Sequence, residues 1–254
     1  NRSAAPVISL PMPDGSSARF RVWESSIQEA GLAAKFPEIR TFAGQGIDDP
    51  YATIRFDYNP YFGFSAQILS PNGRIYIDPY ARMDVNNYIS YYHRDNRRRS
   101  AFKCDVVSEP IDEAQPRTTA GPCLGTTLRT YRLAVACTGE YSQAVGGGVA
   151  GPTHAAIVTT TNRVNGVYEV ELAVRLVLIA NNNLIEYLNG ATDPFVNTIN
   201  TALLNANQAN TDAVIGSANY DIGHVFTSDD NGLAQLNAVC GSGKARGATG
   251  APVL

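Results

Sequence analysis

Short runs in which apolar and polar residues alternate dominate the chain between Val7 and Pro79. Each run mixes this alternation with β-branched or aromatic residues, as half-buried strands do. The predicted strands are 18–23, 52–58, 62–69 and 74–77. The Asn72-Gly73 pair between the last two favours a two-residue turn, so we predict a β-hairpin there.

One segment of this region, 26–35, has helical spacing instead. Ile27, Leu32 and Ala33 would face a core, and Pro37 would end the helix because proline cannot continue it. The first part of the chain is therefore predicted to be mostly β, with one helix.

The periodicity changes after Arg129. Segment 131–138 reads as a short apolar strand, and 152–165 as a helix that Gly166 ends. A long strand is predicted over 168–180, since residues two apart share one face of a strand. The residues on that face are Val170, Leu172, Val174, Leu176 and Leu178.

A second helix is predicted to begin at Asp193, with Pro194 in its first turn. Its apolar residues are Phe195, Ile199 and Leu203, and the strands predicted after it are 222–227, 232–239 and 245–248. Strands that alternate with helices form a mixed α/β layer. The predicted fold class is α+β: a β-rich first domain followed by an α/β subdomain with a twisted mixed sheet.

Composition changes again between residues 94 and 125, where Arg, Pro and Gly replace most apolar residues. We predict an exposed linker here and two domains, 1–125 and 126–254. The triplet Arg97-Arg98-Arg99 within it is either a solvated charge run or a processing site for a basic-specific protease.

The chain of 254 residues is 44% hydrophobic, which suffices for a sizeable core. Only 17% of its residues are charged and the net charge is -3, so nothing favours binding to nucleic acid or an anionic membrane. No apolar run is long enough to span a bilayer. The chain is rich in Asn, Ser, Thr, Gly and Tyr and has few Lys, a composition that suits an exported protein. We therefore expect the protein to be secreted.

Four segments of the second half stand out: YRLAVACTGEY (131–141), NRVNGVYE (162–169), YDIGHVF (220–226) and the stretch 232–247, which begins GLA and ends CGSGKARG. Together they resemble the reprolysin-like metzincin peptidases of bacterial exported type. Four ordered segments are a more specific signal than one short motif. The first 100 residues are more loosely similar to the pro-regions that precede such domains.

The resemblance implies a zinc peptidase whose helix carries HExxHxxGxxH. That motif supplies zinc ligands from one helical face and a glutamate as general base. It is absent from the sequence, so the chain is expected to cover a pro-region and the front of a catalytic domain, to bind no zinc and to be inactive alone. The expected partners are a protein or peptide substrate and the remainder of the catalytic domain.

In the family the strand that corresponds to Gly232, Leu233, Ala234, Gln235 and Leu236 is the edge of the sheet above the cleft. The resemblance therefore implies that these residues bind an extended substrate through the backbone. From sequence alone the segment is equally an ordinary strand, since edge position leaves no sequence signature.

Cysteines Cys104, Cys123, Cys137 and Cys240 lie too far apart in sequence for a CxxC site. They are structural disulfides or spare thiols, with Cys137–Cys240 and Cys104–Cys123 as one possible pairing. The resemblance adds another role for Cys104: a thiolate near the end of the pro-region that ligates zinc and keeps the enzyme latent, although the usual Pro-Lys-x-Cys-Gly motif is missing.

His93, His154 and His224 have no ligand spacing, so we expect core or surface roles for them, and for His224 a structural or cleft-lining role. The carboxylate pairs Glu169 with Glu171 and Asp229 with Asp230 lack a neighbouring nucleophile and are expected to be solvated. The favoured function is thus part of a secreted, latent zinc metalloendopeptidase. The alternative is a non-enzymatic inhibitory or chaperone pro-region, or a protein-binding module.

Overall fold

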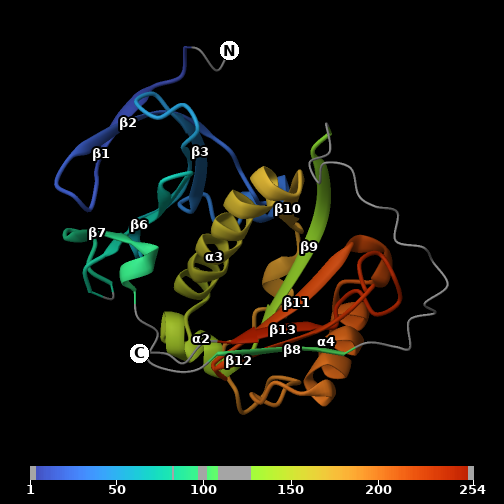
Figure 1. The fold of residues 1–254 in the computed structure, drawn as a ribbon. Coiled ribbons are helices and arrows are strands. Elements are labelled where there is room, and N and C mark those ends of the chain that lie inside the picture. The colour runs from blue at the N-terminus through green and yellow to red at the C-terminus, as the bar shows by residue number, and fades with distance from the viewer. Residues whose placement is uncertain (1–3, 82, 97–101, 108–126, 251–254) are drawn as a thin grey trace.

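Two sheets with a long helix between them form the protein (Figure 1). The computed structural model describes residues 4–81, 83–96, 102–107 and 127–250. The long helix is α3 (Ala150–Glu171), which contacts the first sheet on one side and the second sheet on the other. The predicted fold class is confirmed, because an antiparallel sheet precedes a mixed sheet with helices.

The first sheet is an antiparallel meander in which each strand pairs with the next along the chain. Its strands are β1 (Val7–Pro11), β2 (Ser17–Glu24), β3 (Arg40–Gly46), β4 (Thr53–Asn59), β5 (Gly63–Ser70), β6 (Gly73–Pro79) and β7 (Tyr88–Tyr92). Phe20, Ile54 and Ile68 fill a core on one face. The four predicted strands are confirmed as β2, β4, β5 and β6, and β1, β3 and β7 had not been predicted.

The hairpin between β5 and β6 is also confirmed. Ser70 pairs with Gly73, so Pro71 and Asn72 form the turn, one position earlier than predicted. Gly73 has a φ of 125°, a conformation that glycine adopts readily and other residues rarely do.

The helix predicted over 26–35 is mostly wrong. Only α1 (Ala30–Ala33) is helical, and the backbone before it is extended and bonds to the second sheet. Ile27 and Leu32 are buried as predicted, but against the second half of the chain. Tertiary pairing overrides the weak helical spacing of this short segment.

The second sheet has the order β10-β9-β11-β13-β12-β8. Its strands are β8 (Lys103–Val107), β9 (Arg129–Cys137), β10 (Val174–Leu178), β11 (Ile222–Thr227), β12 (Asn231–Gln235) and β13 (Gly247–Gly250). All neighbours run parallel except β12 and β13. Alternate residues of β9 face opposite ways: Leu133 and Val135 pack with α3, while Ala134 and Ala136 pack with α4 (Thr201–Val214).

The helix predicted over 152–165 is confirmed within α3, but Gly166 does not end it. A Cβ on Gly166 would lie 2.4 Å from Oε1 of Gln67, so this glycine permits close packing on the first sheet. The strand predicted over 168–180 is therefore wrong in its first part. α3 runs on to Glu171, and only β10 is extended, after Ala173 with a φ of 53°.

The helix predicted to begin at Asp193 is wrong by several residues. α4 begins after Asn200, whose side chain accepts a hydrogen bond from the amide of Leu203. The Asp193 carboxylate accepts from the amides of Gly139 and Phe195, so it caps the start of α2 (Gly139–Gly146) and a local turn. Asp193 therefore begins no helix of its own, and it bonds instead to the first amide of α2, whose N-cap is Thr138.

The exposed linker predicted over 94–125 contains a strand that had not been predicted. β8 pairs with β12 and so belongs to the second sheet, as the green strand at the lower edge in Figure 1 shows. Residues 97–101 and 108–126, with Arg97-Arg98-Arg99, lie outside the described part. The domain boundary at residue 125 stays a prediction, but two segments before it contribute to the second sheet.

Among described residues, no helix combines the length and apolarity needed to cross a membrane.

Candidate functional site

Of the five residues predicted to bind substrate, Gly232 to Gln235 lie on β12, and Leu236 directly follows this strand. β12 is the second strand from one edge of the second sheet. β13 pairs with it on one side in antiparallel orientation, and β8 pairs with it on the other side in parallel orientation. In this chain, β12 is therefore not the outermost strand. The position at which an added strand would pair with β12 is occupied by β8.

Hydrogen bonds show which groups of β12 face β8. The amide of Leu236 donates to the carbonyl of Val107 at 3.0 Å, and the amide of Gln235 donates to Arg246 on the opposite side at 2.9 Å. Backbone groups point to alternate sides along a parallel ladder. The amide and carbonyl groups that point toward β8 are therefore those of Gly232, Ala234 and Leu236. Leu233 and Gln235 direct theirs toward β13. Of the five predicted residues, three thus present backbone groups to the occupied edge.

Cys104 lies on β8 directly opposite Gly232. Its thiol is free and exposed, and a Cβ on Gly232 would lie 3.4 Å from the sulfur atom. The glycine therefore leaves space for the thiol over β12. The predicted latency cysteine and the predicted substrate residues are adjacent, in a way that their separation in sequence does not reveal.

The predicted Cys137–Cys240 disulfide is not formed, because both thiols are free. Cys137 pairs in register with Phe226, whereas the amide of Cys240 donates to the carbonyl of Asp221. Strand residues between 221 and 226 span about 16 Å, and the Cα atoms of a disulfide lie within about 7 Å. Burial raises the pKa of the Cys137 thiol well above its usual value. Cys123, the other predicted partner of Cys104, lies outside the described residues.

An apolar groove of about 630 Å³ lies between α3 and the adjacent face of the second sheet. Its lining includes Leu133, Val135, Val164, Leu176, Ile222 and Phe226. Nearby surface residues Tyr168, Leu172 and Val239 extend the apolar lining outward. This face of the sheet is only partly covered by the described residues.

His224 is the one histidine in this groove. Its Nε2 lies 2.9 Å from Oγ1 of Thr249, and its ring packs edge-on against Phe226. Loss of solvation lowers the pKa of His224 to about 4, so the ring is neutral near pH 7. A structural or cleft-lining role was predicted for it, and these contacts accord with one.

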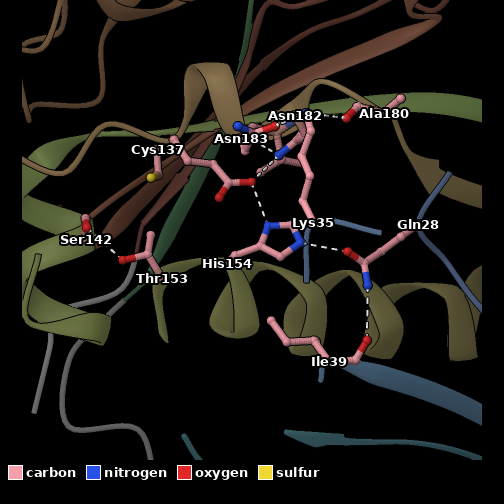
Figure 2. A network of polar contacts seen from close by, with 12 residues as sticks. Gln28, Lys35, Ile39, Cys137, Ser142, Thr153, His154, Ala180, Asn182 and Asn183 are labelled. Carbon is pink, nitrogen blue, oxygen red and sulfur yellow. Dashed lines mark hydrogen bonds and ion pairs between the residues drawn. The ribbon is translucent and has the colours of Figure 1, made fainter. Parts of the chain in front are cut away.

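His154 belongs to a buried polar network that joins distant segments (Figure 2). Its Nδ1 lies 2.8 Å from Oε1 of Glu186, its Nε2 lies 2.7 Å from Oε1 of Gln28, and Phe36 stacks on the ring at 4.1 Å. The Gln28 amide nitrogen donates to the carbonyl of Ile39, which leaves its oxygen to accept from the ring. Each ring nitrogen thus lies within hydrogen-bond distance of a side-chain oxygen, one from Glu186 and one from Gln28.

The carboxylates considered in the sequence have structural partners or lie at the surface. Glu169 is on the last turn of α3 rather than on a strand, and it accepts from Arg55 and Arg175 at 2.5 Å each. These two guanidinium groups hold the pKa of Glu169 below its usual value, although burial opposes the shift. Asp229 accepts from the amide of Ile199.

Within the described residues, no group of three or more His, Cys, Asp or Glu side chains is arranged to hold a metal ion. His154, His224 and Cys104 lie in different surroundings: a buried network, a groove and an exposed edge. The residues present thus do not fit a catalytic zinc site, which needs three converging protein ligands.

Comparison with protein families identifies the second half of the chain, which carries five of the six strands of this sheet, as part of a metallopeptidase domain. The matching family is described as Metallo-peptidase family M12B Reprolysin-like, and the match covers residues 127–253. The chain therefore belongs to the reprolysin-like metallopeptidases, a zinc-dependent family that acts on proteins, and the resemblance seen in its sequence is confirmed. No curated protein matches the chain.

Sequence reasoning missed two features of this region. β8 was assigned to a linker, although Val106 and Val107 give a weak strand signal. The Gln28–His154–Glu186 network has no local signal, since its members are separated by 126 and 32 positions. Only the folded chain brings these residues together.

Proposed function

We propose that this chain belongs to a secreted zinc metalloendopeptidase made as a latent precursor. Residues before about 125 act as the pro-region, and the zinc-binding helix is supplied by a remainder of the catalytic domain. The family match over residues 127–253 supports the peptidase assignment. The apolar groove beside α3 is the surface on which we expect that remainder to pack, because it would bury side chains such as Ile222 and Phe226.

We further propose that an extended peptide substrate pairs with Gly232, Ala234 and Leu236, and that β8 keeps the precursor latent by occupying their backbone groups. The observation that carries this proposal is the pairing of β8 with β12. A strand already bonded to this edge excludes another from the same hydrogen bonds. Cys104 stands at this edge as the candidate zinc-binding thiol of the latent state.

The peptidase assignment is tested on the protein purified from its producing cells. Intact mass and zinc content are measured together with peptide hydrolysis, with and without a chelator. One zinc per molecule and chelator-sensitive cleavage are the expected results. A zinc-free protein that binds peptidases or peptides without turnover would contradict the assignment and favour the inhibitory or chaperone alternative.

The role of β8 is tested with two proline substitutions. The alternation along the ladder directs the amide of Asp105 toward β12 and the amide of Val106 away from it. Asp105→Pro should therefore loosen β8, whereas the matched control Val106→Pro removes a donor that does not face β12. We expect at least several-fold tighter binding of an extended fluorescent peptide to Asp105→Pro alone. Equal binding by both variants would refute occlusion by β8.

A further inference from the structure

Residues 25–39, here called the inserted segment, leave the first sheet between β2 and β3 and enter the core of the second half. Ile27 and Leu32 are fully buried, and Ile39 is 3% exposed. These side chains pack in one cluster with Leu133, Val135, Cys137, Ala155, Ile157, Val158, Leu176 and Leu178. The apolar core of the peptidase half is therefore completed by residues from the first half of the chain.

The inserted segment also closes one edge of the second sheet. The amide of Leu178 donates to the carbonyl of Ile27 at 2.7 Å, and the amide of Glu29 donates to the carbonyl of Leu178 at 2.9 Å. The Glu29 carboxylate then accepts from the amide of Ala180 at 2.8 Å. Without this segment, the outer backbone groups of β10 would lose these partners.

The buried histidine network depends on the same segment. Gln28 supplies the acceptor for Nε2 of His154, and Phe36 covers its ring. His154 and Glu186 are almost completely shielded from solvent, with side-chain exposures of 0% and 3%. Removal of the segment would leave Nε2 of His154 without its hydrogen-bond partner in an apolar cavity. An unsatisfied polar group in such surroundings lowers the stability of the fold.

β8 is held quite differently at the opposite edge. Lys103, Cys104, Asp105 and Val106 are exposed, and the strand pairs along one side only. The inserted segment is fixed by core packing and a buried network, whereas β8 rests on edge hydrogen bonds and on the single partly buried side chain of Val107. When the chain is cut, the inserted segment should therefore stay in place, whereas β8 should be able to leave the sheet.

We infer that the inserted segment is a permanent part of the peptidase half. When the chain is cut between residues 107 and 127, the first half stays bound as a noncovalent subunit, and only β8 leaves its edge. The association follows from the packing alone, while its meaning for activation rests on the proposed function. Activation then needs local displacement of one strand rather than loss of the whole first half.

Ion pairs between the first sheet and α3 offer a different way of holding the two parts. Arg55 pairs with Glu169 at 2.5 Å, and Arg163 pairs with Asp78. Salt weakens such contacts by screening, with a Debye length of about 3 Å at 1 M ionic strength, although partly buried pairs like these are screened less than exposed ones. Apolar packing of the inserted segment does not weaken in this way. Release of the first half at high salt would therefore point to the ion pairs, whereas the Leu32→Asp variant tests the core packing directly.

The test uses the full chain with a specific protease site inserted between residues 107 and 127. After cleavage, both fragments should co-elute in gel filtration at about 0.1 M and about 1 M salt, and separate only in denaturant. Elution of the N-terminal fragment on its own under native conditions would overturn the inference. Because no peptidase activity is measured, failure of the proposed function would not affect this result.

Hydrogen exchange on the cut wild-type protein tests which contact opens. The amide of Leu178 should stay protected, while that of Leu236, which donates to β8, should lose at least tenfold protection. Loss at both amides, or retention at both, would contradict the inference. As a variant, Leu32→Asp should release the N-terminal fragment after cleavage, whereas the same change at exposed Ala30 should not.

Discussion

Replacement of Asp57 by asparagine is expected to stabilise the protein at pH 8 and to have little effect below pH 4. Asp57 lies on β4, 1% exposed, and faces α3. Its carboxylate accepts from the hydroxyl of Thr159 at 2.7 Å, while the nearby Arg163 is paired with Asp78. Burial is the largest influence on this carboxyl and raises its pKa from 3.8 to about 7.

The size of the effect follows from this shift. A folded-state pKa above the unfolded one means that stability is fully present below pH 3.8 and is lost as the pH rises toward 7. A difference of roughly 3 pH units at about 1.4 kcal/mol each sets an upper bound of about 4 kcal/mol. Asparagine has nearly the same shape, accepts from Thr159 and carries no charge. We therefore expect a gain of about 2–4 kcal/mol for Asp57→Asn at pH 8.

Urea unfolding between pH 4 and pH 8.5 provides the measurement. The difference in free energy of unfolding between Asp57→Asn and wild type should grow from near zero at pH 4 and level off above pH 7. Asp48→Asn serves as control, because Asp48 is exposed and paired with Arg19, which lowers its pKa. That variant should lose a little stability at pH 8. A stability change for Asp57→Asn that is the same at every pH would refute the reasoning.

Two further outcomes are expected, one from the partly buried His224 and one from the buried Asn165. His224 has a folded pKa of about 4 against 6.5, so its contribution is complete above pH 6.5 and is lost as the pH falls toward 4. Between pH 6.5 and pH 4, the loss in free energy of unfolding should be smaller by roughly 2 kcal/mol in His224→Gln than in wild type. An unchanged pH profile in urea unfolding would contradict this. Asn165 accepts from the amide of Leu176 at 2.7 Å and donates to its carbonyl at 2.8 Å. Asn165→Ala should cost about 2–3 kcal/mol in thermal unfolding, against about 1 kcal/mol for loss of the Asn200 cap, and equal costs would count against the bridging role.

The contacts between the two halves give these residues a functional context. Asp57 and Arg163 lie where the first sheet meets α3, whereas Ile27 and Leu32 lie inside the second half. A pro-region that only covered a cleft would not need to complete the hydrophobic core behind it. The first half of this chain thus combines an exposed strand paired with β12 and a buried segment in the core of the second half.

Local sequence patterns determined the elements whose signals lie within a few residues. β2, β4, β5 and β6 alternate with period two, and the hairpin follows from its turn residues. The four segments between Tyr131 and Gly247 that resemble a peptidase family can likewise be recognised one by one, and they lie within the residues 127–253 that match this family. A strand beginning at Gly232 was also predicted in this way, and its role in binding stays a prediction.

Only the tertiary structure decided where segments of ambiguous pattern belong. Residues 168–171 alternate well enough for a strand, yet α3 continues through them, and Lys103–Val107 forms a strand because β12 offers an unpaired edge. The inserted segment shows the same dependence, since Gln28 and His154 meet across 126 positions. Local preferences are worth tenths of a kcal/mol per residue, whereas burial in a shared core is worth about 1.5–3 kcal/mol for each large apolar side chain. Where the two conflict, packing between distant segments prevails, and a sequence read in short windows does not contain that information.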